Sequence, residues 1–446
     1  MAEGAARLTA RAAIALVADA FTEHAPPPPG PSTAPDGPLA WDGYDAARAR
    51  AGTRTGESES VVFGEAVVSG VRCAVLAFEF GFLGGSLGER TGDRLCAAYR
   101  LAREGGVPLV SLVATGGSRM QEGMVALTQL QRVARESVLL REAGVPHVSV
   151  LRDPVTGGGW ATVGAGADVV LALPGAQIGF AGSRVRPVDA DPAAYTAEGQ
   201  LAAGHVDAVV PADALRTALG RWLTALTRPA PGPVPPPSVP GGTGGLPGSG
   251  WEAVRRARDA ARPRAEAYLE AYFEERLPLT GDRCGGTDPG LLCGVGLREG
   301  RGVVYAAQCG TATRPAGYRT AARVIRLADR LGLPVLTLVD TPGAANDAEA
   351  ERAGAGAAIA EVFAAVAGAR VPVTTLVVGE GGSGGALALA APGNTWATRD
   401  SYFSVIAPEL AAAILKRPPE EAPHTAEQLR LRPQDLVELG VVRGIV

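Results

Sequence analysis

Short runs of apolar residues, each bounded by glycine or proline, recur along the chain and predict buried strands. The run Leu109–Val113 follows Pro108 and stops before Gly116-Gly117, which is typical of a parallel strand buried on both faces. The two glycines leave the backbone free to turn sharply and let a ligand approach closely. A helix-compatible segment follows from Arg119. The pattern therefore predicts a strand, a glycine turn and a helix start, a geometry that points backbone N–H groups at negative charge.

Longer segments with helical spacing of apolar residues alternate with such strands. Val61–Val68 and Val71–Phe78, joined by Ser69-Gly70, predict a strand hairpin in the first half of the chain. The predicted helices include Leu8–Thr22, Arg90–Arg103, Met124–Ala143, Ala212–Thr227 and Glu252–Arg276. Strands that alternate with helices through short glycine turns predict βαβ units and a parallel sheet in each half.

The second half of the chain repeats the first at a constant offset. Pro108 and Gly117 lie 226 positions before Pro334 and Gly343, and Gly158 keeps the same distance from Gly384. The register continues without a gap from about residue 100 to residue 160 of the first half. A match of this length is hard to obtain by chance, so the sequence predicts an internal duplication.

A segment of unusual composition separates the two copies. Residues 227–250 are almost entirely Pro, Gly, Ser and Thr, a composition typical of linkers, and we expect this segment not to pack. The predicted domains are therefore residues 1–226 and 251–446, joined by a linker at 227–250.

Composition limits the classes of partner and compartment. The 446 residues carry 42 basic and 46 acidic side chains, a net charge of −4, which argues against nucleic acid as the main partner. The five cysteines show no CxxC spacing, so we expect no disulfide framework, no metal site and a reducing, cytoplasmic environment. No signal-peptide pattern and no apolar run of about 18 residues is present, so we expect no membrane association.

The chemistry is expected at the glycine turns, of which each half has two. If parallel strands place the turns of one half side by side, their N–H groups converge into an oxyanion hole, which stabilises an enolate as negative charge develops on a carbonyl oxygen. Alternatively, the glycines only permit tight packing of helix on strand. Because the chain has four such turns, two at matching positions in each copy, we favour the oxyanion-hole interpretation over the packing interpretation. The predicted donors are Gly116, Gly117, Gly157 and Gly158 in the first half and Ala344, Gly384 and Gly385 in the second.

Several motifs at these turns resemble one enzyme family. GGSRMQEG (from Gly116), DPVTGG (from Asp153) and IGFAG (from Ile178) are similar to the β subunit of bacterial acetyl-CoA carboxylase carboxyltransferase. DTPGA (from Asp340), GEGGSGGALAL (from Gly379) and SYFSVIAPE (from Ser401) are similar to its α subunit. Because both subunits belong to the crotonase superfamily, the resemblance implies an α/β fold of two tandem crotonase-like (ββα spiral) domains, here a β–α fusion.

The resemblance also implies a mechanism with little side-chain catalysis. Carboxybiotin on a carrier protein would release CO2 in the site, its ureido nitrogen would take the α-proton of an acyl-CoA thioester, and the enolate would attack CO2. Gly117 and Gly158 would then hold the thioester oxygen, and Ala344, Gly384 and Gly385 that of biotin, although the sequence leaves open which hole takes which ligand. The implied partners are a biotin carboxylase, a biotin carboxyl carrier protein and a second copy of the chain, because the first half of one chain would meet the second half of another.

Further residues are expected to bind substrate. They are Gly84, Gly85, Arg119, Gly182, Arg184, Gly343 and Ala388. Arg119 and Glu122, three positions apart, could instead pair with each other, and Arg184 is as well suited to a surface salt bridge as to a CoA phosphate. Ala388 is small and compatible with several short acyl chains.

The sequence also departs from the family pattern. The β subunit's four-cysteine zinc ribbon is absent, and the α subunit's DTPGAYPG motif continues here as Ala344-Ala345-Asn346-Asp347. Two rival functions therefore stay open. One is a biotin-independent decarboxylase of a malonyl-type thioester, and the other is a non-catalytic scaffold subunit of a carboxylase complex.

Overall fold

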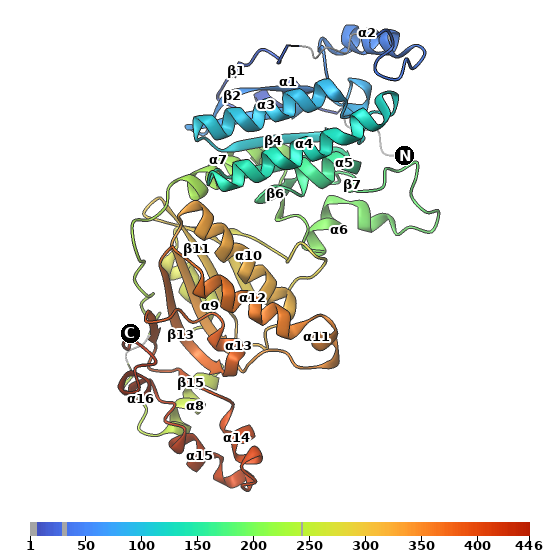
Figure 1. Ribbon diagram of the computed structural model, residues 1–446. Coiled ribbons are helices and arrows are strands. Elements are labelled where there is room, and N and C mark those ends of the chain that lie inside the picture. The colour runs from blue at the N-terminus through green and yellow to red at the C-terminus, as the bar shows by residue number, and fades with distance from the viewer. Residues whose placement is uncertain (1–6, 29–33, 242–243) are drawn as a thin grey trace. The chain divides into compact units, whose positions relative to one another are not determined.

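The computed structural model describes residues 7–28, 34–241 and 244–446. The chain divides into two compact units, which we call unit 1 (Met1–Thr227) and unit 2 (Arg228–Val446). Each unit is a sheet covered by helices (Figure 1).

The sheet of unit 1 joins an antiparallel edge to a parallel centre. Its order is β1-β2-β3-β4-β5-β6-β8, with β7 paired to β5. Pairs β1–β2 and β2–β3 are antiparallel, which confirms the predicted hairpin, and the pairs from β3 onwards are parallel. The strands are β1 (Ala20–Glu23), β2 (Val61–Val68), β3 (Val71–Phe78), β4 (Leu109–Thr115), β5 (His147–Thr156), β6 (Val169–Ala172), β7 (Ile178–Gly179) and β8 (Ala208–Val209).

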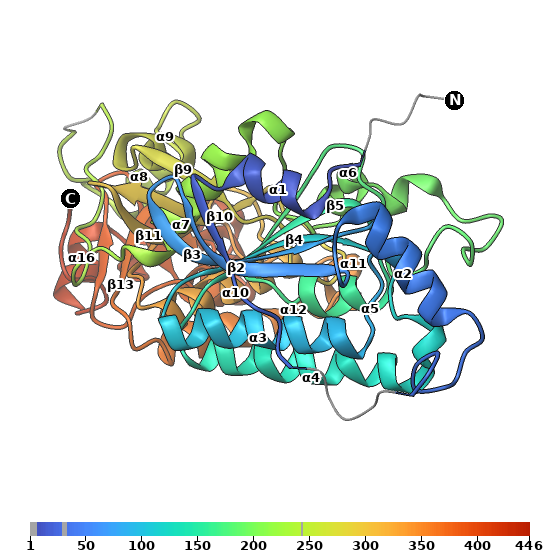
Figure 2. The same ribbon diagram turned by 90° about the horizontal axis from the view of Figure 1, so that it is seen from above.

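Helices cover both faces of this sheet. The main ones are α1 (Ala10–Val17), α2 (Tyr44–Thr55), α3 (Glu89–Gly105), α4 (Gly123–Glu142), α5 (Gly157–Gly159), α6 (Ala197–Ala202) and α7 (Leu215–Thr227). Helices α3 and α4 lie side by side on one face and α1 on the other (Figure 2). Every residue of β4 is buried, which explains its continuous apolar run.

The prediction of a helix over Leu8–Thr22 is wrong for its last five residues. Helix α1 ends at Val17, and the chain then enters β1, where Phe21 pairs with Ala66 of β2. Phe21 had the spacing of a helical apolar face, but the backbone bonds of an edge strand outweigh that weak local preference.

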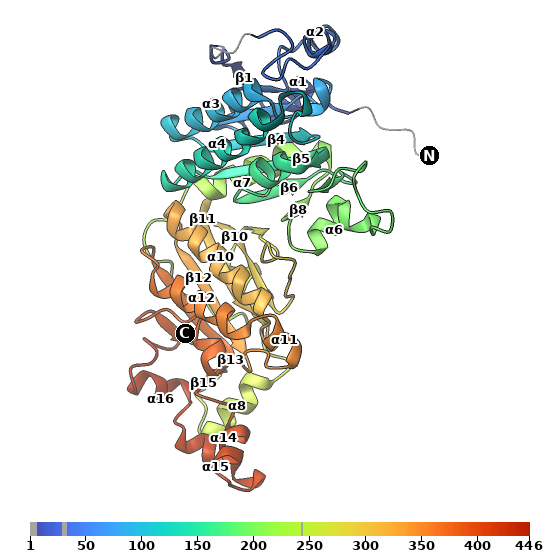
Figure 3. The same cartoon turned by 45° about the vertical axis from the view of Figure 1, so that its right-hand side comes forward.

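Unit 2 repeats this architecture. Its sheet has the order β14-β13-β12-β11-β10-β9, with β15 paired to β13. The strands are β9 (Glu275–Pro278), β10 (Leu291–Arg298), β11 (Arg301–Gln308), β12 (Val335–Thr341), β13 (Val373–Gly382), β14 (Thr395–Ala397) and β15 (Tyr402–Ser404). The helices are α8 (Gly250–Arg258), α9 (Ala265–Tyr272), α10 (Pro315–Leu331), α11 (Ala348–Arg352), α12 (Ala355–Ala367), α13 (Ser383–Leu387), α14 (Pro408–Ile414), α15 (Ala422–Gln428) and α16 (Pro433–Glu438). Helices α10 and α12 lie side by side along the sheet (Figure 3).

Equivalent elements of the two units confirm the duplication. The bounds of α3, β4 and β5 lie 226 positions before those of α10, β12 and β13, whereas β2 and β3 lie 230 positions before β10 and β11. The copy in unit 2 is therefore four residues shorter between the hairpin and the following helix. The alignment of the two units has no insertion or deletion where the strands lead into the glycine turns.

Two predictions at the start of unit 2 need correction. The single helix Glu252–Arg276 is divided into α8 and α9, because Pro263 disfavours helical backbone at the residue before it. Part of the segment 227–250 does pack: Pro229 pairs with Gly302, and Val234 is buried in the core, where its carbonyl accepts a bond from Thr374 Oγ1 at 2.7 Å. Prolines lack N–H groups but still offer carbonyls and apolar rings.

Among the described residues, no helix combines the length and the apolar content that crossing a bilayer demands.

Candidate active site

The two glycine turns of unit 1 lie side by side. Strands β4 and β5 are parallel neighbours, so they deliver both turns to the same edge of the sheet. The ladder is irregular between Val113 and Thr115, after which Gly117 has a φ of 101°. A Cβ atom built onto Gly157 would lie 3.1 Å from the Cα of Gly117. The structure thus brings together the turns that the sequence predicted to meet.

Unit 2 contains the same arrangement. The ladder between β12 and β13 is irregular between Val339 and Thr341, the equivalents of Val113 and Thr115. In both units a threonine hydroxyl accepts the N–H of the turn glycine at 3.1 Å, Thr115 from Gly117 and Thr341 from Gly343. The backbone of the turn and its internal bond have therefore been kept through the duplication.

A short backbone bridge directs one N–H group out of each turn. In unit 1, Leu87 accepts the N–H of Arg119 at 2.9 Å and donates to the carbonyl of Gly117 at 2.8 Å. Ser118 lies between these two bonds, so its own N–H points away from Leu87. Thr313 bridges Ala344 in the same way. In the described part of the chain, neither the Ser118 nor the Ala344 N–H donates to a protein acceptor, and both residues are partly exposed.

The second turn of each unit is the first turn of a short helix. Gly158 and Gly159 of α5, like Gly384 and Gly385 of α13, occupy positions whose N–H groups have no intrahelical acceptor. A Cβ atom built onto Gly385 would lie 2.6 Å from the Ala344 backbone nitrogen. The helix start and the outward N–H of Ala344 therefore face the same small space.

Some predicted donors already have acceptors within the protein. The N–H of Gly116 bonds to the carbonyl of Gly84 at 2.8 Å, that of Gly157 to Phe180 at 3.0 Å, and that of Gly384 to Ser383 Oγ at 2.6 Å. Gly117 is engaged with Thr115, as described above. Of the predicted donors, Gly158, Ala344 and Gly385 keep N–H groups that have no protein acceptor among the described residues.

Sequence reasoning missed Ser118 and Gly159. The signal for both was available, because the offset of 226 maps Ala344 onto Ser118 and Gly385 onto Gly159. The glycine pair Gly116-Gly117 marks the turn, whereas the outward N–H belongs to the residue after it.

Arg119 lies in a buried ionic cluster beneath the first turn of unit 1. Its guanidinium contacts Glu59 Oε2 at 3.0 Å and Glu122 Oε1 at 3.3 Å, and Tyr44 also hydrogen-bonds to Glu122. The Arg119 guanidinium also donates to the carbonyl of Ser86 at 2.8 Å. Burial alone would raise the pKa of Glu59, but the charge and hydrogen bonds of Arg119 outweigh it and hold that pKa below its usual range. The side chain of Arg119 is 0% exposed, which supports the pairing alternative over substrate contact.

Different residues support the turns of unit 2. Asp340, which is fully buried, pairs with Arg262 at 2.6 and 2.7 Å, and its Oδ1 also accepts the N–H of Glu380 at 3.1 Å. The carbonyl of Gly385 accepts bonds from Tyr318 Oη at 3.0 Å and Gln308 Nε2 at 3.2 Å. The start of α13 is thereby fixed from within the core.

The remaining predicted substrate residues fall into two groups. Gly85 is packed against the turn, because an added Cβ would lie 2.2 Å from the Ala114 carbonyl oxygen, and Ala388 is fully buried at the end of α13. Gly182 and Arg184 lie in a loop after β7, where Arg184 is exposed and forms no ion pair within the described residues. Only Arg184 therefore offers a free charge to a ligand.

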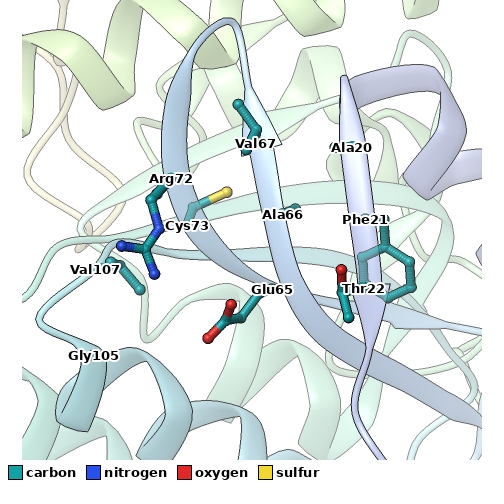
Figure 4. Close-up of a pocket in the computed structure, with 10 residues that line it drawn as sticks. All are labelled: Ala20, Phe21, Thr22, Glu65, Ala66, Val67, Arg72, Cys73, Gly105 and Val107. Carbon is teal, nitrogen blue, oxygen red and sulfur yellow. The ribbon is translucent and has the colours of Figure 1, made fainter.

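The glycine turns do not coincide with the cavity shown in Figure 4. That cavity lies at the amino ends of β3 and of the segment leading into β4, whereas the turns follow the carboxyl ends of the strands. Its lining residues are Ala20, Phe21, Thr22, Glu65, Ala66, Val67, Arg72, Cys73, Gly105 and Val107. In the same described ranges, no three His, Cys, Asp or Glu residues gather to hold a metal ion.

Two protein-family models match the chain, one in each unit. Residues 39–209 match the carboxyl transferase domain, and residues 249–446 match the acetyl co-enzyme A carboxylase carboxyltransferase-like family.

Several relatives align with nine-tenths or more of the chain. The acetyl-coenzyme A carboxylase carboxyl transferase subunits beta/alpha of Salinispora arenicola is 42% identical over 468 residues, covering 99% of this chain and 82% of the relative. The protein of the same name from Saccharopolyspora erythraea is 41% identical over 424 residues, covering 90% and 74%. A probable biotin-dependent acyl-coenzyme A carboxylase beta3 subunit of Mycobacterium bovis is 35% identical over 414 residues, covering 91% and 83%.

The fold matches solved carboxyltransferases. The transcarboxylase 12S core superposes with a TM-score of 0.80 at 20% identity, covering 99% of this chain and 87% of that one. A single-chain, multi-domain long-chain acyl-CoA carboxylase superposes with a TM-score of 0.74 at 21% identity, covering 98% and 44%. The predicted α/β fold of two tandem crotonase-like domains is thereby confirmed. By sequence and by fold, the chain is a carboxyl transferase of the biotin-dependent acyl-CoA carboxylase type. It belongs to the family of the acetyl-coenzyme A carboxylase carboxyl transferase subunits beta/alpha.

Proposed function

We propose that the chain moves CO2 from carboxybiotin to the α-carbon of an acyl-CoA thioester through an enolate held by backbone N–H groups. The observation that carries this proposal is the matched pair of outward N–H groups, Ser118 in unit 1 and Ala344 in unit 2, each beside a helix start. The reaction develops negative charge on two carbonyl-type oxygens, one on the thioester and one on biotin, and two preorganised donor sets suit that chemistry.

Each donor set has one task. The unit-1 set, Ser118 with Gly158 and Gly159, would hold the thioester oxygen while the α-proton leaves. The unit-2 set, Ala344 with Gly385, would hold the ureido oxygen. Carboxybiotin supplies both the CO2 and, once decarboxylated, the base. A methyl group built onto Gly384 would meet no atom within 4 Å, so a ligand has room in front of this turn.

The remaining roles follow from the same reaction. A biotin carboxyl carrier protein would deliver the cofactor, and a biotin carboxylase would recharge it. A homo-oligomer, dimer or higher, would complete the site, with unit 1 of one chain meeting unit 2 of another. The exposed Met120, Met124 and Phe180 flank the unit-1 turns and suit such an interface. The two domains would be unit 1 and unit 2, which divide between Thr227 and Arg228, and the five free cysteines suit the cytoplasm.

The proposal is tested by the reverse half-reaction. Purified protein is incubated with malonyl-CoA, with and without free biotin, and loss of the carboxylate is followed by mass spectrometry. We expect decarboxylation that depends on biotin. Ala344→Pro removes the outward N–H and should abolish the activity, whereas Ala344→Gly keeps the N–H and should retain it.

Other outcomes would replace the proposal. Decarboxylation at the same rate without biotin would favour the biotin-independent decarboxylase. No turnover of malonyl-CoA or methylmalonyl-CoA, even with a biotinylated, uncarboxylated carrier protein present to accept the CO2, would favour the scaffold subunit.

A further inference from the structure

Ser383 has a backbone conformation that favours glycine. It joins β13 to α13 with a φ of 63°, in the left-handed region that non-glycine residues rarely occupy. The equivalent residue of unit 1 is Gly157, with a φ of 60°. The duplication thus kept the conformation but placed a strained serine in one copy, and strain of this kind concentrates at functional sites.

The serine hydroxyl takes up the N–H group at the start of α13. Ser383 Oγ accepts the Gly384 N–H at 2.6 Å, so that N–H no longer points into open space. The hydroxyl keeps its own proton, for which the described residues offer no acceptor. Ser383 is partly exposed, and the space beside Gly384 is open. A hydroxyl that accepts one bond becomes a better donor for the next.

We propose that the Ser383 hydroxyl is a donor of the unit-2 oxyanion hole, placed between the Gly384 N–H and the substrate oxygen. The hole of unit 2 would then combine the Ser383 O–H with the N–H of Ala344, whereas the hole of unit 1 is formed by main-chain groups alone. This inference rests on the proposed function, because it adds a donor to the same site. It makes Ser383 a catalytic residue, since its hydroxyl touches the oxygen that gains charge.

Two variants separate the hydroxyl from the backbone strain. Ser383→Gly removes the hydroxyl and relieves the left-handed conformation, while Ser383→Ala removes the hydroxyl and keeps the strain. We expect both variants to lower kcat of biotin-dependent malonyl-CoA decarboxylation by about 100-fold, the effect of losing one oxyanion donor. The thermal midpoint of Ser383→Gly should equal or exceed that of the parent chain.

Binding gives a readout that is independent of turnover. Isothermal titration calorimetry with free biotin and with malonyl-CoA should show weaker binding of one of the two by both variants, which also identifies the ligand of this hole. Ser383→Gly with parental kcat and binding would overturn the inference while the parent chain remains biotin-dependent. A parent chain without biotin-dependent turnover would instead overturn the proposed function.

Discussion

The turns of unit 1 and unit 2 share their backbone and differ in the side chains that hold it. Both have the irregular ladder, the threonine bond to the turn glycine and the backbone bridge at equivalent positions. Beneath the first turn, however, unit 1 has Arg119 with two glutamates, and unit 2 has Ala345 in the position of Arg119.

Unit 2 solves the same problem from another part of the chain. Its buried arginine, Arg262, comes from the segment between α8 and α9, and its partner Asp340 stands where unit 1 has Ala114. The two copies therefore have different buried ion pairs but the same main-chain geometry at the turns. We infer that selection acted on the direction of the N–H groups and accepted different means of holding them.

The largest expected effect comes from breaking the cluster of unit 1. Arg119→Met leaves Glu59 and Glu122 buried without their cation, which should lower the free energy of unfolding of unit 1 by about 3–5 kcal/mol. Urea unfolding measures the loss of stability, and hydrogen exchange of the backbone amides in β4 and β12 shows which unit is affected. Exchange should accelerate in β4 and stay unchanged in β12.

A matched control sharpens this result. Arg184→Met removes an exposed arginine with no ion pair in the described residues, so stability should not change. Adding Glu59→Gln to Arg119→Met should recover part of the loss. A loss below about 1 kcal/mol in Arg119→Met would show that the cluster does not support the turn.

The next effect concerns the start of α13. Gly385→Ala would press its methyl group against the Ala344 nitrogen at 2.6 Å, so we expect kcat to fall by about 100- to 1000-fold, as when an oxyanion donor is lost. The equivalent Gly159→Ala meets a side-chain methyl group, Thr115 Cγ2, instead of a donor nitrogen, so its loss should be smaller. Equal losses in steady-state kinetics would contradict this difference between the units.

A smaller effect is expected from the support of Gly385. Tyr318→Phe removes one of the two bonds to the Gly385 carbonyl, worth about 1 kcal/mol, and should lower kcat severalfold while leaving KM for malonyl-CoA unchanged. Unit 1 has Gly92 at the equivalent position and no such support. A change in KM alone would assign Tyr318 to substrate binding instead.

The smallest expected effect is a loss of stability of unit 1 that sets in only at acidic pH. The folded-state pKa of Glu59 is lowered, so its stabilisation is complete above its unfolded pKa and is lost as the pH falls through the folded value. Unit 1 should therefore lose stability in acid more steeply in the parent chain than in Glu59→Gln. Urea midpoints between pH 7 and pH 3 measure this, and parallel curves would exclude Glu59 as the source.

Local patterns were sufficient for much of the fold. The hairpin β2–β3 has the predicted bounds, and the offset of 226 holds through α3, β4 and β5, because buried parallel strands require continuous apolar runs. Edge strand β1 was not predictable in the same way, since Phe21 joins a sheet through residues more than 40 positions away.

The site was predictable to the level of the turns but not of their atoms. Glycine pairs marked where the turns lie, yet the outward N–H belongs to Ser118, whose direction depends on a bridge to Leu87. The burial of Arg262 depends likewise on Asp340, 78 positions away. Such partners are chosen by tertiary packing, and no local spacing encodes them.

The use of main-chain N–H groups at Ser118 and Ala344 has a consequence for how this enzyme can change. Every coded residue except proline supplies the same group, so an alanine at position 118, like the one already present at 344, would leave the N–H in place. Mutational drift can therefore replace the side chains around the turns, and with them the acyl chains admitted, while the donor set persists. Libraries that randomise Ser118 and Ala344 with proline excluded should remain rich in active members.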